Sequence, residues 1–152
     1  MDLILWRHAS AEDSNPNDDL VRALTKHGRQ EAEQVANWLR RHLRGEVSMR
    51  VSPARRTCQT ADALGRPYQV FEALSTDGSA HSLLATADWP NQAGTVIVVG
   101  HQPTLGRAAA LLVTGVEYPW PVERGAVWWL RARGRAPPAE IVAVIGPQHA
   151  IH

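Results

Sequence analysis

The sequence has little cysteine, no long apolar run and almost no net charge, and each lack excludes a class of protein. The single cysteine, Cys58, excludes an intrachain disulfide framework and a cysteine-based zinc site. No apolar stretch reaches the roughly 18 residues that a membrane span needs. The N-terminus does not resemble a signal peptide, because Asp2 precedes its short apolar run and Arg7 follows it. Sixteen Lys and Arg against 15 Asp and Glu give no global reason to expect nucleic acid or an anionic membrane as a partner. We therefore expect a cytoplasmic protein with neither partner.

What the chain does have is the length and composition of one globular domain. Its 152 residues are 44% hydrophobic and 20% charged, which excludes a disordered chain and provides enough apolar side chains for a core. No internal repeat or low-complexity linker divides it. We expect a single domain over residues 1–152.

Short apolar strands alternate with amphipathic helices along most of the chain. We expect strands at 3–6, 49–51, 68–71, 95–99, 126–130 and 140–145, and helices from 25 to about 44, 53 to about 64, 79 to 87 and 105 to 113. The polar stretch 11–19 predicts a loop, and the turn at 134–138 predicts an antiparallel hairpin between the last two strands. The pattern predicts a three-layer α/β/α domain whose sheet is mostly parallel, with an antiparallel edge.

Polar residues follow three of the expected strands. The first strand ends in Arg7-His8, the second is followed by Ser52-Pro53-Ala54-Arg55-Arg56-Thr57, and the fourth ends in Gly100-His101. Open α/β sheets bind ligands at the carboxyl ends of their strands. We therefore expect two histidines and at least two arginines to converge in one pocket.

These residue types suit phosphoryl transfer. The planar guanidinium group of arginine donates two parallel hydrogen bonds to phosphoryl oxygens. A neutral imidazole can attack phosphorus, and a second, protonated histidine can donate to the equatorial oxygens. A helix opened by Pro103 would add free amides at the same place. Zinc between His8 and His101 is disfavoured, because the arginines repel a cation and no third ligand is evident.

Four ordered motifs resemble the histidine phosphatase superfamily, which has the phosphoglycerate-mutase-like fold. They are Leu3-Ile4-Leu5-Trp6-Arg7-His8-Ala9, Arg22-Ala23-Leu24-Thr25-Lys26-His27-Gly28, Ser52-Pro53 with Arg56 and Gln59-Thr60, and Val98-Val99-Gly100-His101-Gln102-Pro103. The resemblance extends from Met1 to about Leu112. The short chain, the alanine after His8 and the Gln-Pro after His101 favour the phosphohistidine phosphatases of the SixA type.

The resemblance implies roles for individual residues. His8 is the nucleophile that becomes phosphorylated, Arg7 and Arg56 bind the phosphoryl group, and His101 stabilises that group as a hydrogen-bond donor. Arg22 either anchors the loop after the first strand or contacts substrate. Arg55 falls beside the motif arginine and is expected at the surface. The resemblance implies no metal and no cofactor.

The sequence departs from the superfamily at the proton donor. Many members carry a glutamate after the third strand, whereas here the nearby carboxylates are Glu72 and Asp77, neither of which lies in that motif. Both remain candidate donors. A phosphohistidine or phosphoramidate leaving group needs less protonation than an ester oxygen, so the departure disfavours phosphomonoesters.

These features predict a metal-independent phosphatase that removes a phosphoryl group from a protein phosphohistidine through phospho-His8. The expected partner is a histidine phosphotransfer domain or a phosphotransferase-system carrier. One alternative is a small-molecule phosphatase of the same superfamily, acting on a phosphoester or phosphoramidate metabolite. The other is a non-catalytic phosphoprotein-binding domain, which would not need His8.

Overall fold

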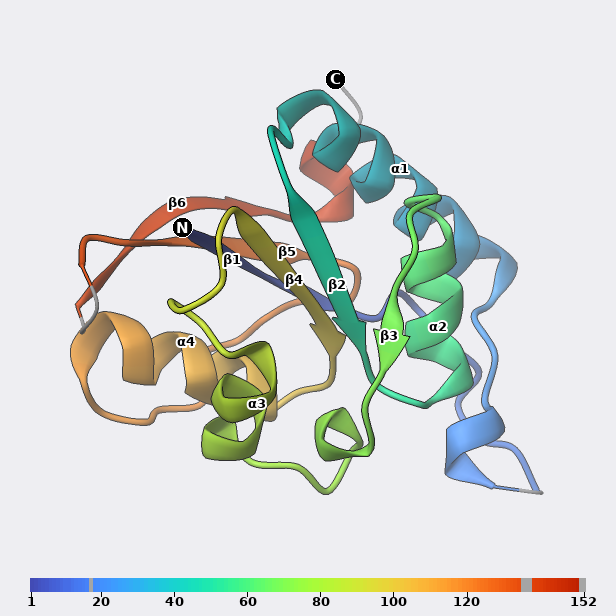
Figure 1. Cartoon of the computed structure of the whole chain (residues 1–152). Coiled ribbons are helices and arrows are strands. Elements are labelled where there is room, and N and C mark those ends of the chain that lie inside the picture. The colour runs from blue at the N-terminus through green and yellow to red at the C-terminus, as the bar shows by residue number, and fades with distance from the viewer. Residues whose placement is uncertain (17, 135–137, 151–152) are drawn as a thin grey trace.

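The computed structural model describes residues 1–16, 18–134 and 138–150, which form one six-stranded sheet with helices on both faces (Figure 1). The strands are β1 (Asp2–Arg7), β2 (Val47–Val51), β3 (Gln69–Val70), β4 (Thr95–Gly100), β5 (Val127–Ala132) and β6 (Ala139–Ile145). The helices are α1 (Lys26–His42), α2 (Arg55–Asp62), α3 (Ala80–Ala87) and α4 (Thr104–Thr114), with short 3-10 turns η1 (Asp19–Val21), η2 (Glu72–Leu74) and η3 (Pro147–His149).

The strand order is β3-β2-β4-β1-β5-β6. The first four of these strands are parallel, and β5 runs antiparallel to both β1 and β6. Arg7 pairs with Gly100, and Val51 pairs with Val99. This register brings the carboxyl ends of β1, β2 and β4 to one edge of the sheet, which is where an open α/β sheet binds its ligands.

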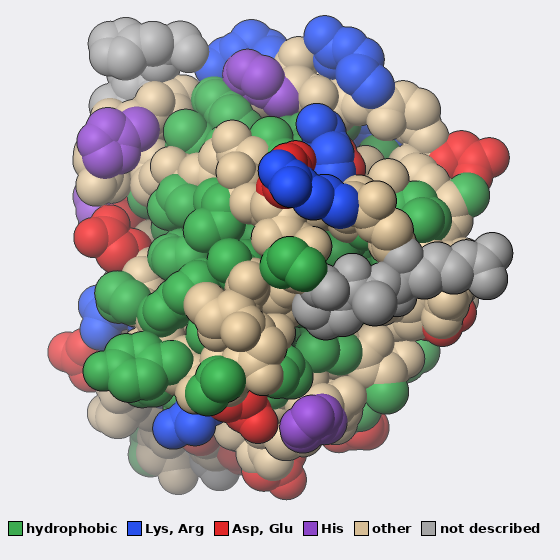
Figure 2. All heavy atoms as spheres, turned by 90° about the vertical axis from the view of Figure 1, so that its left-hand side faces the viewer, with side chains coloured by type: hydrophobic (Ala, Val, Ile, Leu, Met, Phe, Trp, Pro, Cys, Tyr) green, Lys and Arg blue, Asp and Glu red, His purple; other side chains and the backbone are tan. Residues whose placement is uncertain are grey.

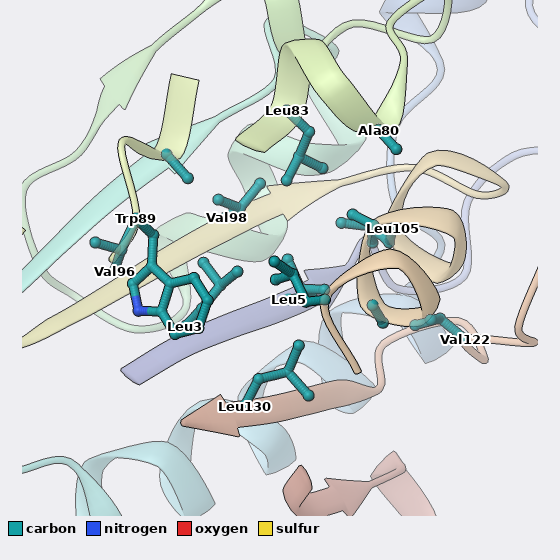
Figure 3. Close-up of a cluster of buried hydrophobic side chains, with 14 of the residues drawn as sticks. Leu3, Leu5, Ala80, Leu83, Trp89, Val96, Val98, Leu105, Val122 and Leu130 are labelled. Carbon is teal, nitrogen blue, oxygen red and sulfur yellow. The ribbon is translucent and has the colours of Figure 1, made fainter. Parts of the chain in front are cut away.

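Two apolar cores lie on opposite faces of the sheet. Alternate residues of β1 serve each face, because side chains along a strand point up and down in turn. Leu3 and Leu5 pack with α3 and α4 in one core, which Figure 3 shows in close-up. Ile4 and Trp6 pack with α1 and α2 in the other. The expected three-layer α/β/α architecture is confirmed.

The start of α1 is fixed by two residues of the second motif. The Thr25 side chain accepts a hydrogen bond from the Gly28 amide at 2.9 Å and so caps the helix, as expected. Gly28 itself approaches the preceding loop so closely that a Cβ there would lie 1.8 Å from the Ser10 carbonyl oxygen. Only glycine permits this contact, which holds the segment after β1 against the helix.

Several expected boundaries move. The third strand shrinks to Gln69–Val70, and α2 begins at Arg55 rather than at Pro53, because Ala54 is still extended. The end of the expected 11–19 loop begins the turn η1, and Asn17 within that loop lies outside the described residues. The hairpin of β5 and β6 is antiparallel as expected, while residues 135–137 of its turn lie outside the described residues.

The outer strand β6 leaves apolar side chains at the surface. Ile141, Val142 and Val144 are exposed. Figure 2 views the molecule from the left-hand side of Figure 1, where the β5–β6 hairpin and α4 lie, and shows apolar side chains over much of this face with charged ones between them. In the described ranges, no helix combines the length and apolar content needed to cross a membrane.

Candidate functional site

The structure brings His8 and His101 together at the carboxyl edge of the sheet. His8 follows β1 and His101 follows β4, and their ring centroids lie 5.5 Å apart. The His8 amide donates to the Gly100 carbonyl at 3.2 Å, which links the two strand ends directly. Both imidazoles are buried.

The backbone fixes the tautomer of His8. Nδ1 of His8 lies 2.8 Å from the carbonyl oxygen of Ala9, and a carbonyl can only accept, so Nδ1 carries the proton. Nε2 is then left with its lone pair. Burial is the largest of the effects that lower the pKa of His8, to about 4, and the charges of Arg56, Arg7 and Arg22 act in the same direction. His8 is therefore a neutral imidazole at neutral pH.

The second imidazole is oriented by Ser52. Nε2 of His101 lies 2.7 Å from the Ser52 hydroxyl, which also accepts the Ala54 amide at 3.3 Å. Because the buried hydroxyl has no other acceptor for its proton among the described residues, we assign that proton to the bond with His101 Nε2, which leaves His101 Nδ1 as the N–H donor. Burial, followed by the neighbouring His8 and Arg56, lowers the pKa of His101 to about 3. Without a bound anion, His101 is then neutral at neutral pH, and it has one N–H to donate; its expected role as a protonated donor to a bound phosphoryl group stays a prediction.

Arg7 and Arg56 lie close enough to His8 to lower its pKa, and each has a buried donor to spare. Arg7 is held by a hydrogen bond from Nη1 to the Val122 carbonyl at 2.9 Å. Arg56 lies in the first turn of α2, and only 2% of its surface is exposed. Within the described part of the chain, Nε of both arginines is buried without a hydrogen-bond partner. Unsatisfied buried donors are rare in proteins and indicate a site for an acceptor, here an anion.

Asp19 is a residue of the site that the sequence did not indicate. Its carbonyl oxygen accepts from Arg56 Nη1 at 2.8 Å, and its Oδ2 accepts from Arg56 Nη2 at 3.1 Å. Its Oδ1 lies 3.0 Å from Arg22 Nε, an ion-pair distance, although the angle does not suit a hydrogen bond. The spacing of Asp19 and Arg22, three residues apart, was the one available signal.

Arg22 anchors the loop after β1, one of its two expected roles. Its Nη1 donates to the carbonyl oxygens of Glu12 and Asp13, at 2.7 and 3.3 Å. It also lies close enough to His8 to lower that pKa. Arg55 is exposed, as expected for a residue beside the motif position.

The two expected candidate proton donors lie outside this cluster. Glu72 begins η2 and Asp77 follows it, and both are exposed. Among the described residues, neither carboxylate forms an ion pair or hydrogen bond with the histidines or arginines of the cluster. The Thr104 hydroxyl donates to the Gly78 carbonyl at 3.3 Å, so the segment with Asp77 borders the start of α4.

Two motif residues of α2 hold the loops around His8. The Ala9 amide donates to the Thr60 hydroxyl at 3.1 Å, and that hydroxyl donates to the Arg56 carbonyl at 2.8 Å. The Gln59 side chain accepts the Leu24 amide at 2.7 Å. These bonds connect the segment after β1 with the helix that carries Arg56.

The start of α4 offers fewer free amides than we expected. Pro103 has no N–H, and the Leu105 amide donates to the His101 carbonyl at 3.0 Å. The Gly106 amide donates to the Gln102 side chain at 2.7 Å, and Gln102 in turn donates to the Trp120 carbonyl at 2.7 Å. The positive charge of the site therefore comes from arginine side chains.

The arrangement combines a neutral imidazole with a free lone pair, a second imidazole and a set of guanidinium donors at one edge of the sheet. Such a set suits a tetrahedral dianion whose central atom is attacked by nitrogen. No group of three or more His, Cys, Asp or Glu residues placed to bind a metal ion occurs in the described ranges.

Comparison with known proteins shows that the chain is similar to phosphatases in sequence and in fold. The family model of the histidine phosphatase superfamily (branch 1) matches residues 3–77. A solved structure of the protein histidine phosphatase SixA, complexed with tungstate, superposes with a TM-score of 0.84 at 25% identity, covering 97% of this chain and 98% of that one. A structure from Nakamurella multipartitia, named "Putative Phosphohistidine Phosphatase SixA", gives a TM-score of 0.80 at 31% identity, with 96% and 95% covered. The phosphohistidine phosphatase SixA homolog of Haemophilus influenzae is 28% identical over 127 residues, 74% of this chain and 77% of that protein.

Proposed function

The chain belongs to the histidine phosphatase superfamily, in its SixA type, and we propose that it hydrolyses phosphohistidine on a protein partner through a covalent phospho-His8 intermediate. The family makes it a phosphatase. The proposal adds the substrate, the nucleophile and the roles of the residues around it.

In the first step, the lone pair on His8 Nε2 attacks phosphorus. A P–N bond to His8 Nε2 forms, and the P–N bond to the substrate imidazole breaks. The other ring nitrogen of the substrate imidazole already carries a proton, so the ring keeps the electron pair of the broken bond and leaves as a neutral imidazole. Arg7, Arg56 and the Nδ1–H of His101 hold the equatorial oxygens. Fixed donors of this kind stabilise the charge that develops on those oxygens in the transition state.

In the second step, water attacks phospho-His8. The new P–O bond replaces the bond to His8 Nε2, the electron pair returns to the imidazole, and inorganic phosphate leaves. The hydrogen bond from Nδ1 to the Ala9 carbonyl is kept throughout, so the ring neither rotates nor changes tautomer. Such preorganisation removes the entropy of orientation from both steps.

The observation that carries the proposal is that His8, with a free lone pair on Nε2, lies near the guanidinium groups of Arg7 and Arg56, whose buried Nε–H groups have no partner among the described residues. The phosphorus of a phosphoryl group is the electrophile that the His8 lone pair can attack, and its oxygens are the acceptors that the arginine N–H groups need. A SixA structure complexed with tungstate, a tetrahedral oxyanion, supports the same ligand geometry.

Phosphohistidine is favoured over phosphomonoesters because no described residue of the site is placed as a proton donor. The carboxylate nearest to the cluster, Asp19, is held ionised, as described below, and Glu72 and Asp77 make no contact with the cluster in the described residues. A phosphohistidine whose other ring nitrogen is protonated releases a neutral imidazole, which is a far better leaving group than an alkoxide and needs no enzymatic acid at the moment of bond cleavage.

Trapping the intermediate tests the nucleophile. Rapid acid-free quenching after mixing with a 32P-labelled phosphohistidine protein should give a labelled enzyme whose label is stable to base and lost in acid. His8→Ala should give no label and no turnover. Full activity in His8→Ala, or the absence of an acid-labile phosphoenzyme in the natural protein, would contradict the mechanism.

A substrate panel tests the leaving group. We expect kcat/KM for a phosphohistidine protein and for phosphoramidate to exceed that for sugar phosphates and phosphoserine. A clear preference for esters would favour the small-molecule phosphatase, and binding without turnover of any of these substrates would favour the non-catalytic domain.

A further inference from the structure

The segment between β1 and α1 places one carboxylate between two arginines of the site. Asp19 Oδ2 lies 3.1 Å from Arg56 Nη2, and Oδ1 lies 3.0 Å from Arg22 Nε. Each carboxylate oxygen thus serves a different guanidinium group. Arg22 and Arg56 repel each other, as the effect of Arg22 on the pKa of Arg56 indicates, and Asp19 neutralises part of that repulsion.

Asp19 leaves the remaining donors of Arg56 available. A guanidinium group has five N–H donors. Asp19 takes one from Nη1 through its carbonyl and one from Nη2 through its carboxylate. The buried Nε–H has no partner among the described residues, and one N–H remains on each terminal nitrogen. The side of the guanidinium group that includes Nε can still bind an oxyanion with two parallel hydrogen bonds.

We propose that Asp19 is a positioning residue of the phosphoryl site. Asp19 binds one edge of the Arg56 guanidinium group and so orients the other edge, which includes Nε, towards the substrate. This inference rests on the proposed function and assigns a role to a residue outside the four motifs.

Asp19 does not act as the missing acid. Its own partial burial would raise the pKa of its carboxyl group, but Arg56 and then Arg22 outweigh this and hold the pKa below its ordinary value. The group is therefore ionised at neutral pH and has no proton to give to a leaving group.

The positioning role and a simple charge effect predict opposite changes in anion affinity when Asp19 loses its charge. Removing a negative charge near an anion site strengthens anion binding if the charge acts only through space. Removing the group that orients Arg56 weakens anion binding instead. In Asp19→Asn, the amide can accept from only one of the two guanidinium groups and turns an NH2 donor towards the other. The side chain is 56% exposed, so the variant should fold.

The experiment measures binding of inorganic phosphate and of tungstate by calorimetry, together with kcat and KM for a phosphohistidine protein. We expect Asp19→Asn to bind both oxyanions about ten- to hundredfold more weakly, in line with the loss of a hydrogen bond between charged groups. KM should rise by a similar factor. Asp19→Glu, which keeps the charge, should recover part of the affinity.

Asp18→Asn is the matched control. Asp18 is the neighbouring exposed carboxylate, and its Oδ1 accepts the Leu20 amide at 3.0 Å rather than an arginine. An asparagine retains this cap, so the variant removes the same charge one residue away. It should bind the oxyanions as well as, or slightly better than, the natural protein.

Three results would overturn the role of Asp19. These are unchanged binding in Asp19→Asn, tighter binding in both variants, and a fall in kcat with unchanged oxyanion affinity, which would identify Asp19 as an acid. Failure of the proposed function would appear differently, as a natural protein that binds neither phosphate nor tungstate, and that result would overturn both proposals.

Discussion

The hydroxyl group of Ser52 lies 2.7 Å from Nε2 of His101, and both side chains are buried. The Ser52 amide also donates to the Val99 carbonyl at 3.1 Å, so the residue is fixed at the end of β2 beside β4. With the hydroxyl proton assigned to this contact, Nδ1 of His101 carries the ring proton. Ser52 is thus a positioning residue for the imidazole that we expect to donate to the phosphoryl group.

Replacing Ser52 by alanine should lower kcat while the fold is retained. Without the hydroxyl, His101 loses the partner that fixes its tautomer, and Nδ1 no longer has to carry the proton. We expect a loss of about ten- to hundredfold in kcat, as for partners that orient metal-bound imidazoles. The imidazole 15N chemical shifts of His101 should change from one tautomer to a mixture.

Ser79→Ala serves as the control for this variant. Ser79 caps α3 through its side chain and, among the described residues, forms no hydrogen bond with His8 or His101. Its replacement should reduce stability by about 1 kcal/mol. If Ser79→Ala lowered kcat as much as Ser52→Ala, or if the His101 shifts were the same with and without Ser52, the positioning role would be wrong.

The acid limb of the pH–rate profile should lie well below the usual range for histidine. Attack requires neutral His8, whose pKa is lowered to about 4, chiefly by burial. Protonation therefore removes activity only as the pH falls through about 4, and kcat/KM should be nearly constant between pH 5 and 7. His8 and His101 titrate as neighbours, so the observed limb belongs to the pair.

The profile is measured as kcat/KM, which reports the free enzyme. The substrate must be stable in acid on the timescale of the assay, so phosphohistidine is replaced by p-nitrophenyl phosphate and initial rates are taken. A limb near pH 6.5, the ordinary value for histidine, would show that the two imidazoles are not held in the buried, cation-rich environment of the structure.

The sequence predicts the elements and motif residues of the site better than it predicts their partners. The sequence predicts Arg7, His8 and His101 as site residues because each lies at the end of an apolar strand, and a parallel sheet brings the strand ends together. The sequence also shows Ser52 as a motif residue. Its contact with His101, however, depends on β2 lying next to β4, and no local sequence pattern predicts that neighbourhood. The sequence therefore predicts no role for Ser52 beyond its place in the third motif.

Asp19 was missed for a similar reason. Its partner Arg56 is 37 residues away, and the loop that brings them together has no periodic pattern. The third strand was predicted too long because Tyr68 and Phe71 have strand-forming side chains, whereas β3 is an edge strand that pairs with β2 at only two positions. Local propensity does not determine how far an edge strand pairs.

Gly28 provides a test of the packing that positions the loop after His8. A glycine in a helix is ordinarily less stable than alanine by roughly 0.5–1 kcal/mol, so Gly→Ala in α1 would normally stabilise the protein. At Gly28, however, the added Cβ would lie 1.8 Å from the Ser10 carbonyl oxygen. That oxygen also accepts the Thr25 amide at 3.1 Å and is therefore not free to move.

We expect Gly28→Ala to lower the free energy of unfolding by about 1–3 kcal/mol, the usual effect of overpacking. It should also reduce kcat, because Ser10 lies two residues after His8 and its displacement shifts the Ala9 carbonyl that fixes the tautomer of His8. Urea denaturation and steady-state kinetics measure the two effects. Gly134→Ala is the control, since a Cβ at Gly134 meets nothing within 4 Å. A Gly28→Ala protein as stable and as active as the Gly134→Ala protein would show that α1 does not press against this loop.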